Sequence, residues 1–290
     1  MKRKNTRRSM VFGTALLALL AFMAPSKNDL PVETSEFVVE VNPDLCPNPN
    51  QTFQGGEVIE YKLYYNLNFI WIAAGKITFR VDDLGDSFKI SADGRTISSF
   101  DWFFKVRDKY EVIMDKETML PISSKRDVVE GKYKLYEEIT WDRSNNKAVS
   151  LRGKSKEKAV LREFELTSCT QDILSVMYHA RNLDYPSYQP GQKFPINIFM
   201  DKEEWPLQGT YLGKDEEKKI KGLGKFNTAV FQPEVISGDV FNSDTEMYIW
   251  TTNDANRLPL LIETPISVGS VKAVLKNYEG LRHDMTARIN

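Results

Sequence analysis

Side chains that could carry catalysis are few in this sequence, and their spacing matches none of the common catalytic motifs. The chain has no Gly-rich phosphate loop, no nucleophile elbow, no Cys-x-x-Cys and no histidine pair at zinc-binding spacing. Of its two histidines, His179 falls in a predicted helix and His283 in the C-terminal tail. A metal site or a Ser-His-acid triad would need one of them. We therefore expect no metal site, no cofactor and no catalytic residue of these kinds.

Carboxylates are plentiful and leave one catalytic alternative open. A glycan hydrolase needs only two acidic groups that flank the scissile bond. Asp101, Asp108 and Glu111 lie close together in the sequence and are the candidates for such a pair. A charged strand face in contact with solvent explains the same residues, so we lean toward a protein that is not an enzyme.

Aromatic residues are the other set that could do chemistry, by stacking on a ligand or lining a cavity. They are densest in FDWFFKVRDKYEVIMD, residues 100–115. In a strand, one face would hold Trp102, Phe104, Val106, Asp108 and Tyr110, and Phe103 would join the charged residues on the other. Alternation favours a core face and a solvated face, with ligand lining as the second interpretation.

A second apolar stretch, NLNFIWIAAG at residues 66–75, is apolar on both faces of a strand around residues 69–74. Such a strand is either buried on both sides or forms an exposed hydrophobic lip. Large amphipathic rings line lipid cavities and also stack on sugars. The ligand-lining residues that the sequence predicts are Phe69, Trp71, Trp102, Phe104 and Tyr110.

The N-terminus has the pattern of an export signal. Residues 1–8 contain five basic side chains and no acid, and residues 10–24 form a charge-free apolar run that is short for a bilayer span. Removing residues 1–24 takes away five of the 39 basic residues and none of the 40 acidic ones, leaving a net charge of −6. This mildly acidic chain has no excess of positive charge that would bind the phosphates of a nucleic acid. Its sequence also has no further apolar stretch long enough to span a membrane. We expect a periplasmic or secreted protein.

The two cysteines, Cys46 and Cys169, are expected to form a disulfide, since an even cysteine count in an exported chain favours pairing. The bond would close a loop from residue 46 to residue 169 and contribute about 4–5 kcal/mol by the chain-entropy relation. Two unpaired thiols in separate environments are the alternative.

Most of the remaining sequence has the period of β-strands. In EVIEYKLYYNL, residues Ile59, Tyr61, Leu63 and Tyr65 fall on one side and polar residues on the other. One helix is predicted at about 169–184 and ends at a Pro-rich turn. The fold class is mainly β: antiparallel curved sheets or a partly closed barrel, with one substantial helix.

The second half of the sequence repeats some residues of the first half at a distance of 138 residues. Tyr110 falls on Tyr248, Leu120-Pro121 on Leu258-Pro259, Gly131 on Gly269 and Lys134 on Lys272. This indicates two similar β modules, although shared hairpin chemistry could mimic a repeat. The predicted organisation is a signal peptide at 1–24, an extended leader at 25–54, a first module at 55–150, a charged hairpin region and connecting helix at 151–187, a second module at 188–282 and a tail at 283–290.

The sequence resembles the domain-of-unknown-function family 3108, a family of exported bacterial proteins, from Gly56 to Leu281. The resemblance rests on Lys105-Val106-Arg107-Asp108, Leu120-Pro121, Asp172-Ile173-Leu174-Ser175, and Leu258-Pro259 through Gly269-Ser270-Val271-Lys272. The leader with Cys46 is not part of that pattern. The family has no assigned activity, so the resemblance implies no catalytic residue. At the level of architecture, the sequence pattern is also similar to that of exported lipoprotein-carrier folds, in which a curved sheet wraps a lipid cavity.

Together these features favour an exported envelope protein that binds a hydrophobic or amphipathic molecule such as a lipid, without catalysis. A carbohydrate- or peptidoglycan-binding module is the first alternative and requires exposed tryptophans beside Asp and Asn. An acid-pair glycan hydrolase and a scaffold for another envelope protein are the others.

Overall fold

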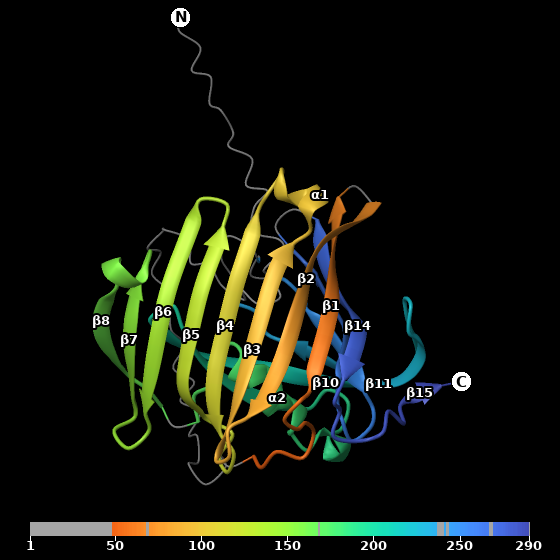
Figure 1. Cartoon of the computed structure of the whole chain (residues 1–290). Coiled ribbons are helices and arrows are strands. Elements are labelled where there is room, and N and C mark those ends of the chain that lie inside the picture. The colour runs from red at the N-terminus through yellow and green to blue at the C-terminus, as the bar shows by residue number, and fades with distance from the viewer. Residues whose placement is uncertain are drawn as a thin grey trace, which may run out of the picture.

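The computed structural model describes residues 48–67, 70–167, 169–236, 241, 244–266 and 269–289. The predicted signal peptide, most of the predicted leader, Cys46 and Phe69 lie outside these residues. Within them the chain is mainly β, as the sequence predicts, and its strands join into one antiparallel sheet (Figure 1).

The sheet contains 15 strands. Those of the first half are β1 Val58–Leu67, β2 Ile70–Asp83, β3 Ser87–Thr96, β4 Val106–Asp115, β5 Pro121–Glu130, β6 Tyr133–Asp142, β7 Lys147–Gly153 and β8 Val160–Glu165. Those of the second half are β9 Lys193–Met200, β10 Glu203–Ile220, β11 Gly224–Pro233, β12 Tyr248–Thr252, β13 Pro259–Pro265, β14 Ser270–Glu279 and β15 Arg288–Ile289. The helices are α1 Ser98–Asp101 and α2 Ser175–Arg181, with 3-10 turns η2 Lys156–Lys158 and η3 Tyr185–Ser187.

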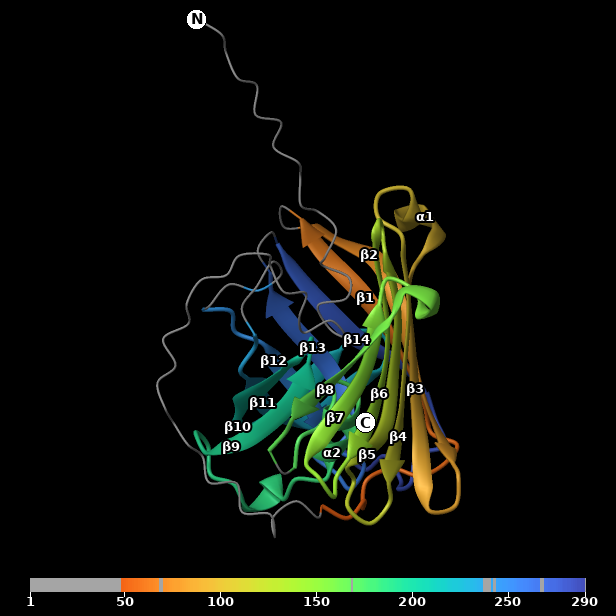
Figure 2. The same cartoon turned by 90° about the vertical axis from the view of Figure 1, so that its left-hand side faces the viewer.

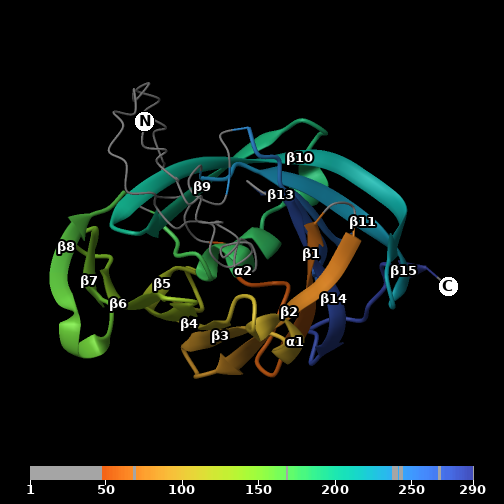
Figure 3. The ribbon, with the colours of Figure 1, turned by 90° about the horizontal axis from the view of Figure 1, so that it is seen from above.

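The order of the strands divides the sheet into two meanders that meet where β1 pairs with β14. The order is β8-β7-β6-β5-β4-β3-β2-β1-β14-β13-β12-β11-β10-β9, and β15 pairs with β11. From above, the sheet curls around α2 until its edge strands β8 and β9 approach each other (Figure 3). The segment after β8 spans this seam: the Thr167 amide donates to the Glu204 carboxylate at 3.0 Å, and Gln171 forms a parallel bridge with Ile198.

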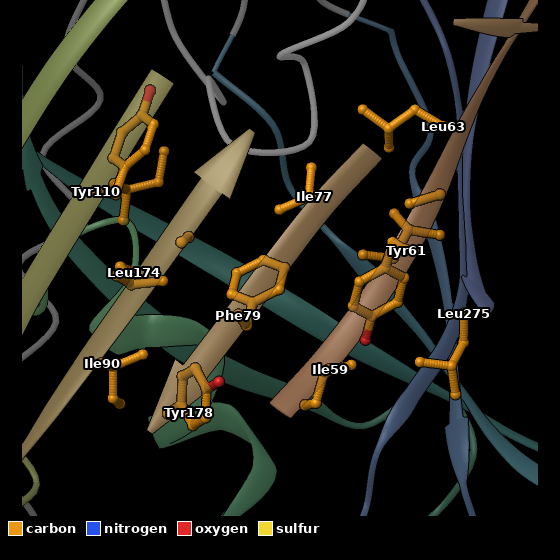
Figure 4. Close-up of a cluster of buried hydrophobic side chains, with 14 of the residues drawn as sticks. Ile59, Tyr61, Leu63, Ile77, Phe79, Ile90, Tyr110, Leu174, Tyr178 and Leu275 are labelled. Atoms are coloured by element: carbon orange, nitrogen blue, oxygen red, sulfur yellow. The ribbon is translucent and has the colours of Figure 1, made fainter. Parts of the chain in front are cut away.

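The alternation of β1 explains why the sheet curls around an apolar interior. Ile59, Tyr61, Leu63 and Tyr65 are buried, as predicted, while the residues between them are half-buried on the outer face. These side chains meet those of β2, β3, β4, β14 and α2 in one large core (Figure 4). The largest buried cluster therefore lies on the concave face, against the helix.

Helix α2 confirms the predicted helix but occupies only the middle of the predicted range. The Asp172 carboxylate accepts hydrogen bonds from the backbone amides of Leu174 (2.8 Å) and Ser175 (2.6 Å) and thus caps the helix start. Gln171, just before Asp172, pairs with Ile198 of β9 and is not helical, because the chain crosses the seam there. Beyond Arg181 the chain turns into η3, where Pro186 lies in the first turn.

The C-terminal end of α2 is held inside the molecule by a buried ion pair. Arg181 donates to both oxygens of Glu57, at 2.6 and 2.9 Å, and also to the backbone carbonyls of Thr52 and Asn256. Both charged side chains are almost fully buried. The pair therefore joins the helix to the segment before β1 and to the turn before β13.

The predicted strand over residues 100–105 is wrong, because the chain changes direction there. Residues 97–105 connect the antiparallel strands β3 and β4, and α1 forms the turn between them. The Asp101 carboxylate accepts from Arg107 Nη2 at 2.6 Å and from the Thr96 hydroxyl, which fixes the turn. Alternation begins only at Val106, and from there the predicted core face is correct, with Val106, Asp108 and Tyr110 buried.

The 138-residue offset also relates backbone features of the two halves. Strands β5 and β13 each begin at the proline of a Leu-Pro pair, and the residue before that pair, Met119 or Arg257, has a left-handed conformation with φ of 55° or 49°. The first six strands of each meander follow at about the same offset. Both predicted modules lie in one sheet, and their origin by duplication stays a prediction.

Candidate ligand-binding site

The structure places the predicted lining residues in different environments. Tyr110 is 3 % exposed and belongs to the main core. Phe104 is half-buried, with its ring against Gly131. Trp71 is 37 % exposed and Trp102 is 82 % exposed. Phe69 lies outside the described residues, so the predicted lining as a whole stays a prediction.

A cleft lies instead at the seam of the curled sheet, between the concave face of β6–β8 and the turn from β9 to β10. Figure 2 shows the molecule from the side on which β6, β7 and β8 lie. The volume of the cleft is about 620 Å³. We call it the cationic cleft, and its lining residues are Lys132, Tyr133, Lys134, Leu135, Ser150, Arg152, Gly153, Lys154, Val160, Arg162, Phe164 and Lys202.

Strand register explains how part of the lining comes together. Arg152 on β7 lies opposite Glu137 on β6 and opposite Val160 on β8. Ser150, two residues away on the same face, lies opposite Arg162. Because side chains at alternate positions point to the same side, one face of β6–β8 carries Arg152, Arg162 and the apolar residues of the cleft. Lys132, Lys154 and Lys202 come from turns, and Lys134 alternates to the other face at the start of β6.

The base of the cationic cleft is a buried network of four charged groups. Arg126 Nε lies 2.9 Å from Glu137 Oε2, and Arg152 Nη1 lies 3.0 Å from the same oxygen. Asp201, in the β9–β10 turn, contacts Arg126 Nη2 at 2.9 Å and Arg152 Nη2 at 2.6 Å. Ser150 donates to the other oxygen of Glu137 at 2.8 Å. The network holds the β9–β10 turn against the opposite end of the sheet.

These contacts settle the ionisation of the network. Burial opposes the charge on Glu137, but Arg126 and Arg152 hold the pKa of this carboxyl below its ordinary value. Burial likewise opposes the charge on Arg126, and Glu137 and Asp201 outweigh it and raise the pKa of the guanidinium. Two cations and two anions thus balance one another at the base of the cleft.

The remaining cations of the cleft have no such partner. Lys132, Lys134, Lys154, Arg162 and Lys202 are exposed, and none forms an ion pair with another residue in the part of the chain that the structure describes. The residues that the structure describes in this lining include no carboxylate. The cleft therefore carries an excess of positive charge beside an apolar wall of Tyr133, Leu135, Val160 and Phe164.

The acidic residues that the sequence offered for catalysis do not meet in the cleft. Asp101 is bound to Arg107, and the hydrogen bonds from Arg107 and Thr96 lower the pKa of its carboxyl to about 2. Glu111 is exposed and lies 3.3 Å from Lys89.

A buried pair of carboxyls lies beyond the cleft, on the concave face of β4 and β5: Asp108, which the sequence offered as a candidate, and Glu130, which it did not. Asp108 Oδ1 accepts from the Val129 amide at 2.9 Å, and Oδ2 has no hydrogen-bond partner among the described residues. Burial, and then repulsion from Glu130, raises the pKa of Asp108 to about 8, and burial raises that of Glu130 to about 7. Neither residue lines the cationic cleft.

A smaller pocket lies between α2 and the concave face of β9–β13. It has a volume of about 110 Å³, and its lining is mostly apolar, with Met177, Phe194, Ile196, Phe231 and Ile249 among its residues. Arg181 forms an ion pair with Glu57, whereas Arg257 lies over the ring of Tyr185 and donates to the backbone carbonyls of Arg181 and Leu183. The pocket can hold a small apolar group beside the half-buried guanidinium of Arg257.

Two further properties bear on function. No group of His, Cys, Asp or Glu side chains in the described ranges is arranged to hold a metal ion. Among the same residues, no helix has the length and apolar character needed to cross a bilayer.

Comparison with known proteins identifies relatives without an assigned activity. A family model described as "Protein of unknown function (DUF3108)" matches residues 60–276. No curated protein sequence matches the chain. The crystal structure of a beta-barrel-like protein of the domain of unknown function DUF1849, from Brucella abortus, is similar with a TM-score of 0.54 and 10 % identity, over 80 % of this chain and all of that one.

Two other solved structures match with a TM-score of 0.31. One is described as a candidate lipoprotein from Parabacteroides distasonis, at 10 % identity, covering 81 % of this chain and 99 % of that one. The other is a candidate exported protein with a YmcC-like fold from Bacteroides fragilis, at 9 % identity, covering 79 % and 97 %. The similarity to the Brucella protein therefore indicates a shared fold and no more.

Proposed function

This chain belongs to the DUF3108 family, whose function is unknown, and from its geometry we propose that it binds an amphipathic molecule with an anionic head group. We infer that it acts in the cell envelope after export, on the basic head and apolar run of residues 1–24. The proposed site is the cationic cleft. The observation that carries the proposal is the placement of five unpaired cations beside an apolar wall in one concave surface.

The positive charge of the cleft indicates that the head group of the ligand is an anion. The network at the base of the cleft is neutral, so the cations around it attract an anion without competition from a neighbouring carboxylate. Hydrogen bonds between Arg or Lys and a phosphate or carboxylate are among the strong ones in proteins. Arg162, which reaches the cleft from the edge strand β8, offers a planar donor set for such a group.

The apolar wall indicates that the ligand also has an apolar part, such as an acyl chain. Val160 is 59 % exposed and Tyr133 is 44 % exposed, which is unusual for large apolar side chains on the concave face of a sheet. Covering them with an acyl chain would remove apolar surface from water, a gain of about 25 cal/mol per Å². The cleft volume of about 620 Å³ lies within the range of small-molecule sites.

The other functions have less support. An acid-pair hydrolase needs two carboxylates in one cleft, and the described lining of the cationic cleft offers none. A carbohydrate-binding module needs exposed rings beside free Asp or Asn groups. Trp102 is exposed, but Asp101 beside it is bound to Arg107. Trp71 is also exposed, but the side-chain amide oxygen of Asn66, the residue opposite it, is buried. Sugar stacking therefore lacks the polar partners that would orient the ligand.

The first experiment identifies what the protein carries. The full chain is expressed in a bacterial host, and the exported form is purified without detergent and extracted with organic solvent. Mass spectrometry of the extract, against a control protein exported and purified in the same way, is expected to show an anionic amphiphile at near-stoichiometric amount. A neutral glycan in its place would contradict the proposal.

The second experiment locates the site. Binding of monomeric lysophosphatidylglycerol and lysophosphatidylcholine with the same acyl chain is measured by titration calorimetry. We expect the anionic lipid to bind more tightly, and the variant Lys132→Glu/Arg162→Glu to weaken it at least about tenfold. Lys214→Glu/Lys219→Glu is the matched control, since both lysines are exposed on β10 outside the cleft. Equal affinity for the two lipids, or an equal loss in both variants, would refute the site.

A further inference from the structure

A second surface, at the end of the molecule that contains α1, exposes apolar side chains from two separate segments. The first is the start of β2, with Ile70 (65 % exposed), Trp71 and Ile72; the second follows α1, with Trp102 and Phe103. We call these five residues the aromatic end. Figure 1 shows the start of β2 and α1 at the same end of the sheet. The Ile97 amide donates to the Ala74 carbonyl at 3.1 Å, which fixes one segment against the other.

The rings of the aromatic end are held by contacts with one another and with a lysine. The Trp102 and Phe103 centroids are 5.9 Å apart, and Phe103 and Phe100 are 5.5 Å apart, both nearly edge to face. Lys272 Nζ lies 4.2 Å from the centroid of Trp71. Large apolar side chains exposed together in this way mark an interaction surface rather than isolated surface residues.

Beside the aromatic end, four cations form a line across the outer face of β1–β4. Lys62 lies opposite Lys76, Lys76 opposite Arg95, and Arg95 opposite Arg107. We call these residues the cation row. Like charges directly opposite each other destabilise a sheet. The cation row therefore lowers the stability of the sheet, and the fold itself does not require it.

The cation row is mostly uncompensated within the described residues. Only Arg107 forms an ion pair, with Asp101 at 2.6 Å. Asp93, two residues before Arg95 on the same face, lies opposite Thr78 and Lys109; it acts electrostatically on Arg107 but forms no ion pair within the described residues. An external anionic surface would supply the missing charge.

We propose that the aromatic end and the cation row dock this protein on an anionic lipid bilayer surface. Tryptophan rings lie at the boundary between head groups and acyl chains, because one part of the indole is apolar and its N–H needs a polar partner. Isoleucine and phenylalanine side chains add buried apolar area, and each cation near an anionic leaflet adds attraction. Charge complementarity and apolar exposure at one end of the sheet favour a bilayer over a soluble partner.

The docking surface is continuous with the cationic cleft but does not depend on it. Phe104 follows Trp102 and Phe103, and a Cβ atom placed on Gly131 would lie 2.8 Å from its ring. Lys132 and Tyr133, which come next in the chain, line the cleft. A protein docked by the aromatic end would therefore hold one end of the cleft near the membrane.

Vesicle binding tests the inference. The exported form is incubated with vesicles of phosphatidylcholine alone or of equal parts phosphatidylcholine and phosphatidylglycerol, and bound protein is measured by sedimentation. Mass spectrometry identifies the N-terminal residue of the protein in every preparation. Only preparations with the same N-terminus are compared, so that no difference in binding comes from the apolar residues 10–24. We expect binding to the anionic vesicles, at least about tenfold weaker in Lys76→Glu/Arg95→Glu and in Trp102→Ala/Phe103→Ala. All substituted residues are exposed, and circular dichroism checks the fold.

Two comparisons make the result specific. Lys214→Glu/Lys219→Glu is expected to bind anionic vesicles about as the unchanged protein does. Trp102→Phe should keep binding but lose most of the fluorescence quenching by brominated lipid. Binding to soluble polyphosphate with no binding to vesicles would overturn the inference, as would vesicle binding that neither variant pair weakens.

Discussion

Asp201, in the turn between β9 and β10, forms an ion pair with Arg152 on β7, with Oδ1 and Nη2 2.6 Å apart. The two residues come from opposite ends of the strand order, so the pair connects the parts of the sheet that the backbone leaves open. It also forms the base of the cationic cleft. One contact thus serves both the closure of the fold and the shape of the proposed site.

Removing the charge of Asp201 should destabilise the fold. In Asp201→Asn, Arg126 and Arg152 share the single carboxylate of Glu137 in a buried place, and we expect the free energy of unfolding to fall by about 2–4 kcal/mol. Urea denaturation measures the change. Asp82→Asn is the control, because Asp82 is exposed and forms no ion pair with the described residues. Equal stability of the two variants would contradict the role of the pair.

The Glu57–Arg181 pair should behave as a unit. Glu57→Gln leaves a buried guanidinium without its counter-charge, and we expect a loss of about 3–5 kcal/mol in the free energy of unfolding. Glu57→Gln/Arg181→Met removes both charges, so its loss should be smaller than the sum of the two single losses. Additive losses in the double-mutant cycle would show that the two residues act independently.

Asp108 should make stability depend on pH. Its pKa of about 8 means that it is protonated in the folded protein up to about that pH, whereas it ionises near pH 4 in the unfolded chain. Unfolding therefore releases a proton between these values, and its contribution lowers stability as pH rises through the window. Asp108→Asn cannot ionise, so its stability relative to the unchanged protein should rise by about 1.4 kcal/mol per pH unit from pH 5 to 7.

This difference removes the contribution of titrating groups that do not interact with Asp108. Burial lowers the pKa of His179 to about 4, which acts in the opposite direction, since stability is then lost as pH falls below about 6.5. Because His179 is unchanged in the variant, its contribution cancels when the two proteins are compared. A stability difference that stays constant with pH would mean that Asp108 is ionised in the fold.

The disulfide between Cys46 and Cys169 remains a prediction, since Cys46 lies outside the described residues. Cys169 is half-buried, in a left-handed backbone conformation with φ of 67°, at the start of the seam crossing. We expect the exported protein to take up no alkylating reagent before reduction and two equivalents after it, measured by mass under denaturing conditions. Two labels without reduction would exclude the bond.

Local pattern was sufficient for most of the strands. Alternation in β1, and in β4 from Val106 onward, depends only on which residues leave water, and the buried sets match. The same rule failed at Trp102, because alternation says nothing about where a chain must reverse. The exposed Trp102 belongs to the connection between β3 and β4, whose turn is fixed by contacts of Asp101 with Arg107 and Thr96.

The sequence by itself determined a mainly β chain with one helix, the absence of common catalytic motifs and the family resemblance. Only the tertiary structure decided which charges are paired. Arg152, Arg162 and Lys202 look alike as surface cations in the sequence, yet the first is neutralised by Glu137 and Asp201 and the others are not. The reason is physical: ionic contacts act through space, and the curl of the sheet, not the order of the residues, brings β7, β8 and the β9–β10 turn together.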